Sequence, residues 1–198
     1  MFYDAVKNSH SLKYDPFKAL IAPRPIGWIS SLSEDGTINL APYSFFNAVS
    51  ANPHYVFFSS YGRKDSLTNI EATGEFVCSI ATYDLRDHMN KSSAGVPPEV
   101  DEMALADLTP EPSHFVKPPR VKEAPAALEC KYFQTIELPR NDQSDDGYYM
   151  VLGQVVGIYI DDAVIKDGML DMDKIRPLAR LGYMDYTSVD NVFSLDRP

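Results

Sequence analysis

Two adjacent cations and a serine at the start of a predicted helix could bind an anionic ligand. Arg63 and Lys64 come directly before a short helical pattern that opens with Asp65 and Ser66. Free N–H groups at a helix start, a hydroxyl group and two positive charges together favour a phosphate. Arginine would supply two parallel hydrogen bonds and lysine a point charge. Ordinary solvent-exposed loop charges give the same pattern, so these residues alone leave both interpretations open.

Polar residues upstream of this helix could follow the edge of a flat heterocyclic ring. Trp28, Ser30 and Ser31 share a strand-like run, and Ser44 and Asn47 follow in the segment APYSFFNAVS. Adjacent serines are unexpected in a core, because each buried hydroxyl needs a hydrogen-bond partner. The alternative is structural, with Trp28 as an ordinary core residue and an aromatic-rich loop packed on the domain. Their order along the chain favours a site for a flat, phosphorylated ligand.

Several common catalytic and cofactor-binding motifs are absent from the sequence. There is no G-x-G-x-x-G or Walker A loop, so a nicotinamide cofactor would not bind on a Rossmann fold. There is no C-x-x-C or H-E-x-x-H motif, and the four histidines are scattered, so we expect no metal site. A G-x-S-x-G elbow is also missing, which argues against serine hydrolysis. No residue is therefore predicted to be a catalytic acid, base or nucleophile.

Composition narrows the class of protein further. The net charge of −10 argues against partners such as nucleic acid or an anionic membrane surface, which need basic patches. The longest apolar run, Met150 to Ile160, is interrupted by Gln154 and falls short of the ~20 residues that cross a bilayer. No signal peptide is visible, so we expect a cytoplasmic protein. Cys78 and Cys130 could form a disulfide, but buried reduced thiols are the favoured interpretation for a domain of this size.

Short strands must position most of these residues. Strands outnumber helices in the pattern, and long helices between strands are missing, which argues against a doubly wound α/β fold. The sequence instead predicts one mainly β domain, a closed or partly closed antiparallel barrel with short peripheral helices. Predicted strands cover residues 26–33, 37–42, 55–60, 75–83, 128–138 and 148–162, and predicted helices cover 15–21, 65–74, 84–91 and part of 100–108.

Local patterns add details that a structure can test. Asp65 and Asp84 are predicted N-caps, and Gly74 is the predicted end of its helix. In the strand 128–138, apolar residues alternate with polar ones, which predicts that Glu129 points away from the core. Gly153 in the last long strand is predicted to allow a bend or a close backbone approach.

Several separate blocks resemble the flavin reductase-like, FMN-binding split-barrel family, which includes flavoredoxins and the short reductase components of two-component monooxygenases. The blocks are PRPIGWISSLSEDGTINLAPYSFFNAVSANP, GRKDSLTNIEATGEFVCSI, LECKYFQTIEL, VLGQVVGIYIDD and PLARLGYMDY. They occur in the family's order between about Tyr14 and Tyr186. The resemblance implies an antiparallel split β-barrel of Greek-key type, a single FMN-binding domain over residues 1–198 with its core at about 14–186, and a homodimer.

The resemblance also implies which side chains contact the flavin. Near the ribityl chain and phosphate it places Trp28, Ser30 and Ser31. Along the isoalloxazine edge near N5 and O4 it places Tyr43, Ser44 and Asn47. Around the ribityl-phosphate it places Ser59, Ser60, Arg63, Lys64 and Ser66, with Arg24 close by. Family members often carry threonine where this chain has Ser31 and Ser66, and either hydroxyl can bind a phosphate.

The function implied by the resemblance is hydride transfer from NADH or NADPH to N5 of FMN, or of FAD as in some relatives. The cofactors carry out this chemistry, so no acid–base pair is required. Alternatives are a flavoredoxin-type electron carrier with tightly bound FMN, a non-catalytic flavin-binding protein, and an enzyme like pyridoxamine-phosphate oxidase. A monooxygenase or another electron-accepting protein is an expected partner. Residues 91–120, which in the family help to shape the substrate side of the flavin, show no pattern that aligns.

Overall fold

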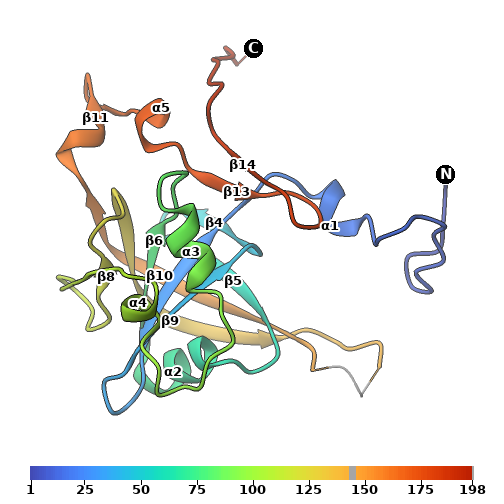
Figure 1. Ribbon diagram of the computed structural model, residues 1–198, viewed down its shortest axis with the longest axis horizontal. Helices are drawn as coiled ribbons and strands as arrows, with labels where there is room; N and C mark the ends of the chain where they lie inside the picture. Colours follow the sequence, from blue (N-terminus) through green and yellow to red (C-terminus); the bar gives the residue numbers. More distant parts are fainter. Residues whose placement is uncertain (143–145, 198) are drawn as a thin grey trace.

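A curled, antiparallel sheet of seven strands forms the body of the molecule (Figure 1). The computed structural model describes residues 1–142 and 146–197. The strand order across the sheet is β3-β2-β6-β9-β10-β5-β4. In chain order the strands are β2 (Gly27–Leu32), β3 (Ile38–Tyr43), β4 (Phe46–Ala51), β5 (His54–Tyr61), β6 (Glu75–Ile80), β9 (Ala126–Glu137) and β10 (Tyr148–Ile160).

The connection between β3 and β4 explains why the sheet curls. These strands lie at opposite edges of the sheet, yet only Ser44 and Phe45 join them. Since consecutive Cα atoms are about 3.8 Å apart, so short a link requires the two edges to approach each other. The Phe45 carbonyl accepts a hydrogen bond of 2.8 Å from the Ser59 N–H of β5, which holds the link against the sheet. The predicted mainly β, split-barrel fold with short peripheral helices is confirmed.

Smaller elements surround this sheet. β1 (Arg24–Pro25), β13 (Leu178–Arg180) and β14 (Tyr186–Ser188) form a three-stranded sheet, and two hairpins pair β7 (Pro110–Glu111) with β8 (Arg120–Val121) and β11 (Ile165–Lys166) with β12 (Met169–Leu170). The helices are α1 (Phe17–Leu20), α2 (Asp65–Thr73), α3 (Arg86–Lys91), α4 (Glu102–Leu105), α5 (Met172–Ile175) and the 3₁₀ helix η1 (Asp162–Val164). Across the described ranges, no helix is both long and apolar enough to cross a membrane.

The core is divided between the two faces of β2. Ile29 packs inside the barrel with Phe58 and Phe76, whereas its neighbour Trp28 packs on the other face with Met89 of α3 and Met103 of α4. This is the alternation that a strand imposes on successive side chains. Helices α3 and α4 therefore cover the outer face of the sheet beside β2 and β3.

Both cysteines lie in the barrel interior, as the sequence predicted. Cys78 of β6 and Cys130 of β9 are free and buried in the same apolar cluster. Burial raises the pKa of the Cys78 thiol to about 12, so this thiol stays protonated at neutral pH.

The prediction that Glu129 points to solvent is wrong. Its side chain is 3% exposed, and its carboxylate accepts hydrogen bonds from the backbone N–H groups of His114 (2.9 Å) and Phe115 (2.6 Å). The segment after β7 covers this face of β9, so the alternating pattern marks two faces that are both buried here. Further along the strand, Ile136 and Leu138 have the predicted apolar pattern but are exposed.

Helix ends and close approaches agree only in part with the predictions. Helix α2 begins with Lys64 as its N-cap rather than Asp65, and α3 has Leu85 rather than Asp84 in that position, and neither cap makes a side-chain bond. The predicted end of α2 is confirmed, because Gly74 has φ = +76° and its N–H bonds to the Ile70 carbonyl. A Cβ atom on Gly153 would lie 2.4 Å from the Phe76 ring, as expected for a close approach.

Candidate functional site

A cleft of about 540 Å³, here called the main cleft, opens where β3 passes into β4 and α2 begins. Its volume lies within the range of pockets that hold cofactor-sized ligands. Its walls come mainly from β3 and its connection to β4, the end of β5, the start of α2 and the loop that follows α3, and Lys18, Glu102 and Tyr148 complete them. The lining residues are Lys18, Asn39, Ala41–Phe45, Ser59, Tyr61, Lys64–Ser66, Ser92–Val96, Glu102 and Tyr148.

Five of the predicted site residues meet in the main cleft, namely Tyr43, Ser44, Ser59, Lys64 and Ser66. They come from β3, its connection to β4, β5 and α2, and the curl of the sheet brings these elements together. Polar groups that follow one another along the sequence therefore line the same cleft.

The start of α2 supplies the cleft with positive potential. Lys64 is the N-cap and has an extended backbone, with φ = −85° and ψ = 171°. The first N–H groups of a helix have no acceptor within the helix and carry a partial positive charge. In the part of the chain that the structure describes, the Lys64 ammonium forms no ion pair with a carboxylate. The helix start and Lys64 together are suited to an anionic group.

Tyr43 places an unsatisfied hydroxyl at this site. The side chain is buried, and among the described residues its hydroxyl oxygen has no hydrogen-bond partner. Burial raises the pKa of Tyr43, while the nearby hydroxyls of Ser66 and Ser60 act in the opposite direction. An unpaired buried hydroxyl lowers the stability of the folded protein by about 1–3 kcal/mol. A ligand that forms a hydrogen bond with the Tyr43 hydroxyl would remove this cost.

A buried hydrogen-bond network forms the floor of the cleft, and its centre is Asn39. The Asn39 side chain accepts hydrogen bonds from Ser66 (2.7 Å) and Ser31 (3.3 Å) and donates one to Glu102 (3.1 Å). The other oxygen of Glu102 accepts a bond of 3.0 Å from the Leu40 N–H. Burial is the largest influence on Glu102 and raises its pKa. This network fastens α2 and α4 to the edge strand β3.

Three further predicted residues are buried behind the cleft and have protein partners. The Trp28 indole N–H donates to the Ser92 hydroxyl at 2.9 Å, and the Ser30 hydroxyl donates to the Pro119 carbonyl at 2.5 Å. Ser31 belongs to the Asn39 network described above. None of the three lines the main cleft. Trp28 does hold Ser92, the first residue of the loop that forms one wall.

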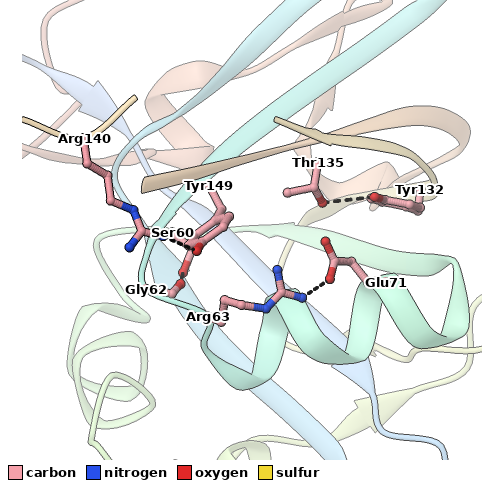
Figure 2. Close-up of polar contacts among 8 residues, drawn as sticks. All are labelled: Ser60, Gly62, Arg63, Glu71, Tyr132, Thr135, Arg140 and Tyr149. Atoms are coloured by element: carbon pink, nitrogen blue, oxygen red, sulfur yellow. Dashed lines mark hydrogen bonds and ion pairs between the residues drawn. The ribbon is translucent and has the colours of Figure 1, made fainter. Parts of the chain in front are cut away.

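Arg63, Ser60 and Asn47 also lie outside the lining of the main cleft. Figure 2 shows the Arg63 guanidinium directed at Glu71, with which it forms an ion pair beside α2. The Ser60 hydroxyl donates to the Gly62 carbonyl at 2.9 Å. Asn47 is exposed on β4, where its side-chain oxygen accepts a bond of 2.8 Å from the next backbone N–H.

Arg24 lines a second cleft of about 480 Å³ that adjoins the main cleft. The two clefts share Lys18, Pro42, Ser44, Lys64 and Ser93. The Arg24 guanidinium donates to the carbonyls of Ile21 (2.5 Å), Leu181 (2.7 Å) and Lys18, which ties β1 to α1 and to the chain after β13.

Several lining residues were not predicted from the sequence. They are Lys18, Asn39, Ala41, Pro42, Phe45, Tyr61, Asp65, Ser92–Val96, Glu102 and Tyr148. The loop 92–96 and Glu102 belong to the stretch 91–120, which offers no motif. The only signal there was a weak helical pattern that includes Glu102. Their role arises because α3 and α4 pack over β2 and β3.

A curled split barrel whose hydroxyl-lined cleft meets a lysine and a helix start is typical of proteins that bind phosphorylated planar ligands. The model of the flavin reductase like domain matches residues 20–179 of this chain. The chain therefore belongs to the flavin reductase-like family and is an oxidoreductase of the flavin-related type.

Relatives and solved structures extend over nearly the whole chain. An uncharacterized protein of Aquifex aeolicus is 37% identical over 169 residues, which cover 82% of this chain and 83% of that protein. The uncharacterized protein YwrF of Bacillus subtilis is 33% identical over 193 residues, with coverage of 93% and 94%. The structure of nitrilotriacetate monooxygenase component B from Bacillus cereus superposes with a TM-score of 0.89, at 31% identity and 98% coverage of both chains. The 2-nitrobenzoate 2-nitroreductase NbaA of Pseudomonas fluorescens gives a TM-score of 0.86 at 26% identity, with coverage of 100% of this chain and 96% of that chain.

Proposed function

We propose that the protein is an NAD(P)H-dependent flavin reductase that binds FMN, or FAD as an alternative, in the main cleft. The observation that carries the proposal is the meeting of Lys64, the start of α2 and the unsatisfied Tyr43 hydroxyl in one cleft of about 540 Å³. The likeness to a monooxygenase component B over the whole chain supports a reductase that serves a second protein.

The lining residues fit FMN by their chemistry. Lys64 and the N–H groups at the start of α2, that of Ser66 among them, would bind the phosphate. Tyr43 and Ser44 would meet polar atoms of the ring system. Aromatic side chains supply apolar surface for a planar ring, since Tyr148 packs against Phe45 (5.9 Å between ring centroids) and Tyr61 (5.1 Å) at the cleft.

The chain's own contribution to the reaction would be binding, orientation and the exclusion of water. Bound flavin supplies the hydride-accepting chemistry. The loop Ser92–Val96 forms part of the cleft wall, and the Trp28–Ser92 hydrogen bond holds it in place. Glu102 is engaged by Asn39 and the Leu40 N–H, so it is assigned a positioning role and no proton transfer.

An absorption spectrum of the purified protein, followed by anaerobic addition of NADH and then NADPH, tests this function. A flavin absorption band at about 450 nm that bleaches rapidly is expected, and comparison of the two rates identifies the preferred donor. Bound flavin that neither donor reduces would instead indicate a flavoredoxin-type carrier or a non-catalytic flavin-binding protein. A protein that cannot take up FMN would contradict the proposal.

We further propose that the protein is a homodimer and passes electrons to a partner such as a monooxygenase component. Support for a dimer comes from exposed apolar side chains on the sheet, among them Val49 of β4 (55% exposed) and Phe133 of β9 (59% exposed). Contiguous apolar patches commonly mark an interface, and the Phe133 ring contacts that of Tyr55 on β5, with 5.5 Å between the ring centroids. The cytoplasmic location stays a prediction.

A further inference from the structure

The second cleft gathers positive charge in a strongly acidic protein. Its lining includes Lys18, Arg24, Lys64 and Arg180, and it contains no aspartate or glutamate. The chain as a whole has a net charge of −10. Within the described residues, none of these four cations forms an ion pair. Such a cluster is electrostatically unfavourable without an anionic partner.

Two of the cations are held directly opposite each other. Arg24 of β1 and Arg180 of β13 are paired residues in the antiparallel ladder. Like charges at opposite positions of a strand pair are destabilising. Burial, and then the charge of Arg180, lower the pKa of Arg24. Arg24 is 6% exposed, and within the described structure its Nε atom is buried without a hydrogen-bond partner. An anion in the second cleft would offset this repulsion.

The Tyr186 ring and the Tyr183 backbone carbonyl orient Arg180, and the two tyrosine rings could also contact a planar part of a ligand. The Arg180 guanidinium lies 4.2 Å from the centroid of the Tyr186 ring and donates a 2.5 Å hydrogen bond to the Tyr183 carbonyl. Both tyrosines line the second cleft and are partly exposed. Fixed cations beside accessible aromatic rings suit a ligand that carries phosphate groups and a planar base.

We propose that the second cleft binds the diphosphate of the nicotinamide dinucleotide, so that the donor lies beside the flavin in the main cleft. This inference rests on the proposed reductase function. The clefts share Ser44 and Lys64, so a donor anchored in one extends into the other. The diphosphate is common to NADH and NADPH, and the cluster Lys18, Arg24 and Arg180 is additional to the groups assigned to the flavin phosphate. The tyrosine faces would receive the adenine ring.

Arg180→Gln in the flavin-loaded protein tests this assignment. ADP-ribose, which contains the diphosphate but cannot donate hydride, should bind the wild-type protein in a calorimetric titration and bind the variant about tenfold more weakly or worse. The KM for the reduced dinucleotide should rise by a similar factor. The KM for reduced nicotinamide riboside, which lacks the diphosphate, should not change, and neither should the affinity for FMN.

Arg176→Gln is a matched control, because the Arg176 guanidinium also stacks on a tyrosine, 4.2 Å from the Tyr83 ring centroid, and lines neither the main cleft nor the second cleft. It should leave all four quantities unchanged. Lys18→Gln is a second test variant whose side chain is exposed, and it should weaken ADP-ribose binding in the same direction even if Arg180→Gln fails to fold.

Three results would overturn the inference: unchanged ADP-ribose affinity in the variants, equal effects on the dinucleotide and the riboside, or a loss of FMN or FAD affinity. The last would assign the cations to the flavin's own phosphate groups. If neither donor reduces the flavin, the reductase proposal fails by itself, and the ADP-ribose titration still decides whether the second cleft binds a diphosphate.

Discussion

The Ser66 hydroxyl of α2 donates a hydrogen bond of 2.7 Å to the Asn39 side chain of β3, across 27 residues of sequence. This bond fixes the start of α2 against the edge of the sheet, at the place where the main cleft opens. The orientation of the helix start, and hence the direction of its N–H groups, depends on β3 as much as on the helix itself. The same contact leads through Asn39 to Glu102 of α4.

Lys64 and Arg63 are adjacent in sequence but should differ in their effect on FMN binding. Lys64 lines the main cleft, whereas Arg63 is paired with Glu71 outside it. Lys64→Ala should weaken FMN binding about tenfold or more, since a charge-assisted hydrogen bond contributes about 1.5–3 kcal/mol. Arg63→Ala should have a much smaller effect. Fluorescence titration with FMN and with riboflavin measures both, and riboflavin, which has no phosphate, should bind the two variants equally well.

An unchanged affinity for FMN in the double variant Arg63→Ala, Lys64→Ala would contradict the phosphate site assigned to the start of α2. A larger loss from Arg63→Ala than from Lys64→Ala would show that the Arg63 side chain leaves Glu71 when the flavin binds.

The Trp28–Ser92 hydrogen bond should stabilise the fold measurably. In Ser92→Ala the fully buried indole N–H loses its partner, and an unsatisfied buried donor costs about 1–3 kcal/mol. We expect the free energy of unfolding in urea to fall by that amount. Ser93→Ala is the matched control, because within the described structure the exposed Ser93 hydroxyl makes one local bond, to the nearby Asn90 carbonyl at 2.6 Å. Equal stability of the two variants would show that the bond contributes nothing.

Glu102 should make stability decrease as pH rises. Burial raises its pKa in the folded protein, so the folded state holds this proton more tightly than the unfolded chain does. Between the ordinary glutamate pKa and the raised value, the folded state binds more protons, and the free energy of unfolding falls with increasing pH. At pH values below the ordinary glutamate pKa, Glu102 is protonated in both the folded and the unfolded state, so it does not make stability depend on pH. At pH values above the raised pKa it is ionised in both states, and its full destabilising effect on the folded state is present.

Glu102→Gln should remove this part of the pH dependence, because an amide does not titrate and its oxygen can still accept one of the two hydrogen bonds. Urea unfolding at a series of pH values from mildly acidic to neutral measures the difference between wild type and variant. If the difference in free energy of unfolding between wild type and Glu102→Gln stays constant over this pH range, the raised pKa assigned to Glu102 is contradicted.

The exposed apolar residues of β9 should take part in a dimer interface. Phe133→Glu introduces a charge where an apolar contact is expected, and burial of an unpaired charge is costly. We expect wild type to sediment as a dimer and the variant as a monomer. Met169→Glu, on the β11–β12 hairpin and 71% exposed, is the control and should remain dimeric. A monomeric wild type, or a variant that stays dimeric, would place the interface elsewhere or exclude it.

Much of the fold follows from local patterns in the sequence. Alternating apolar residues and short segments between turns indicated six of the seven strands of the main sheet, but not β4, and Gly74 indicated the end of α2, because these signals depend on neighbouring residues alone. The resemblance to the flavin reductase-like family, which the match over residues 20–179 confirms, drew on blocks of the same kind. The set Tyr43, Ser44, Ser59, Lys64 and Ser66 was named from sequence and lies together in one cleft.

Only the tertiary structure decided which face of each strand is covered and by what. The alternation around Glu129 correctly separates two faces, but it contains no information that a segment more than ten residues away buries the polar one. Trp28 and Ser30 are behind the cleft for the same reason, since their partners Ser92 and Pro119 are 64 and 89 residues away. The opposition of Arg24 and Arg180 likewise exists only through strand pairing. Sequence determines which groups are available within each element, and packing between distant elements determines which of them share a cleft.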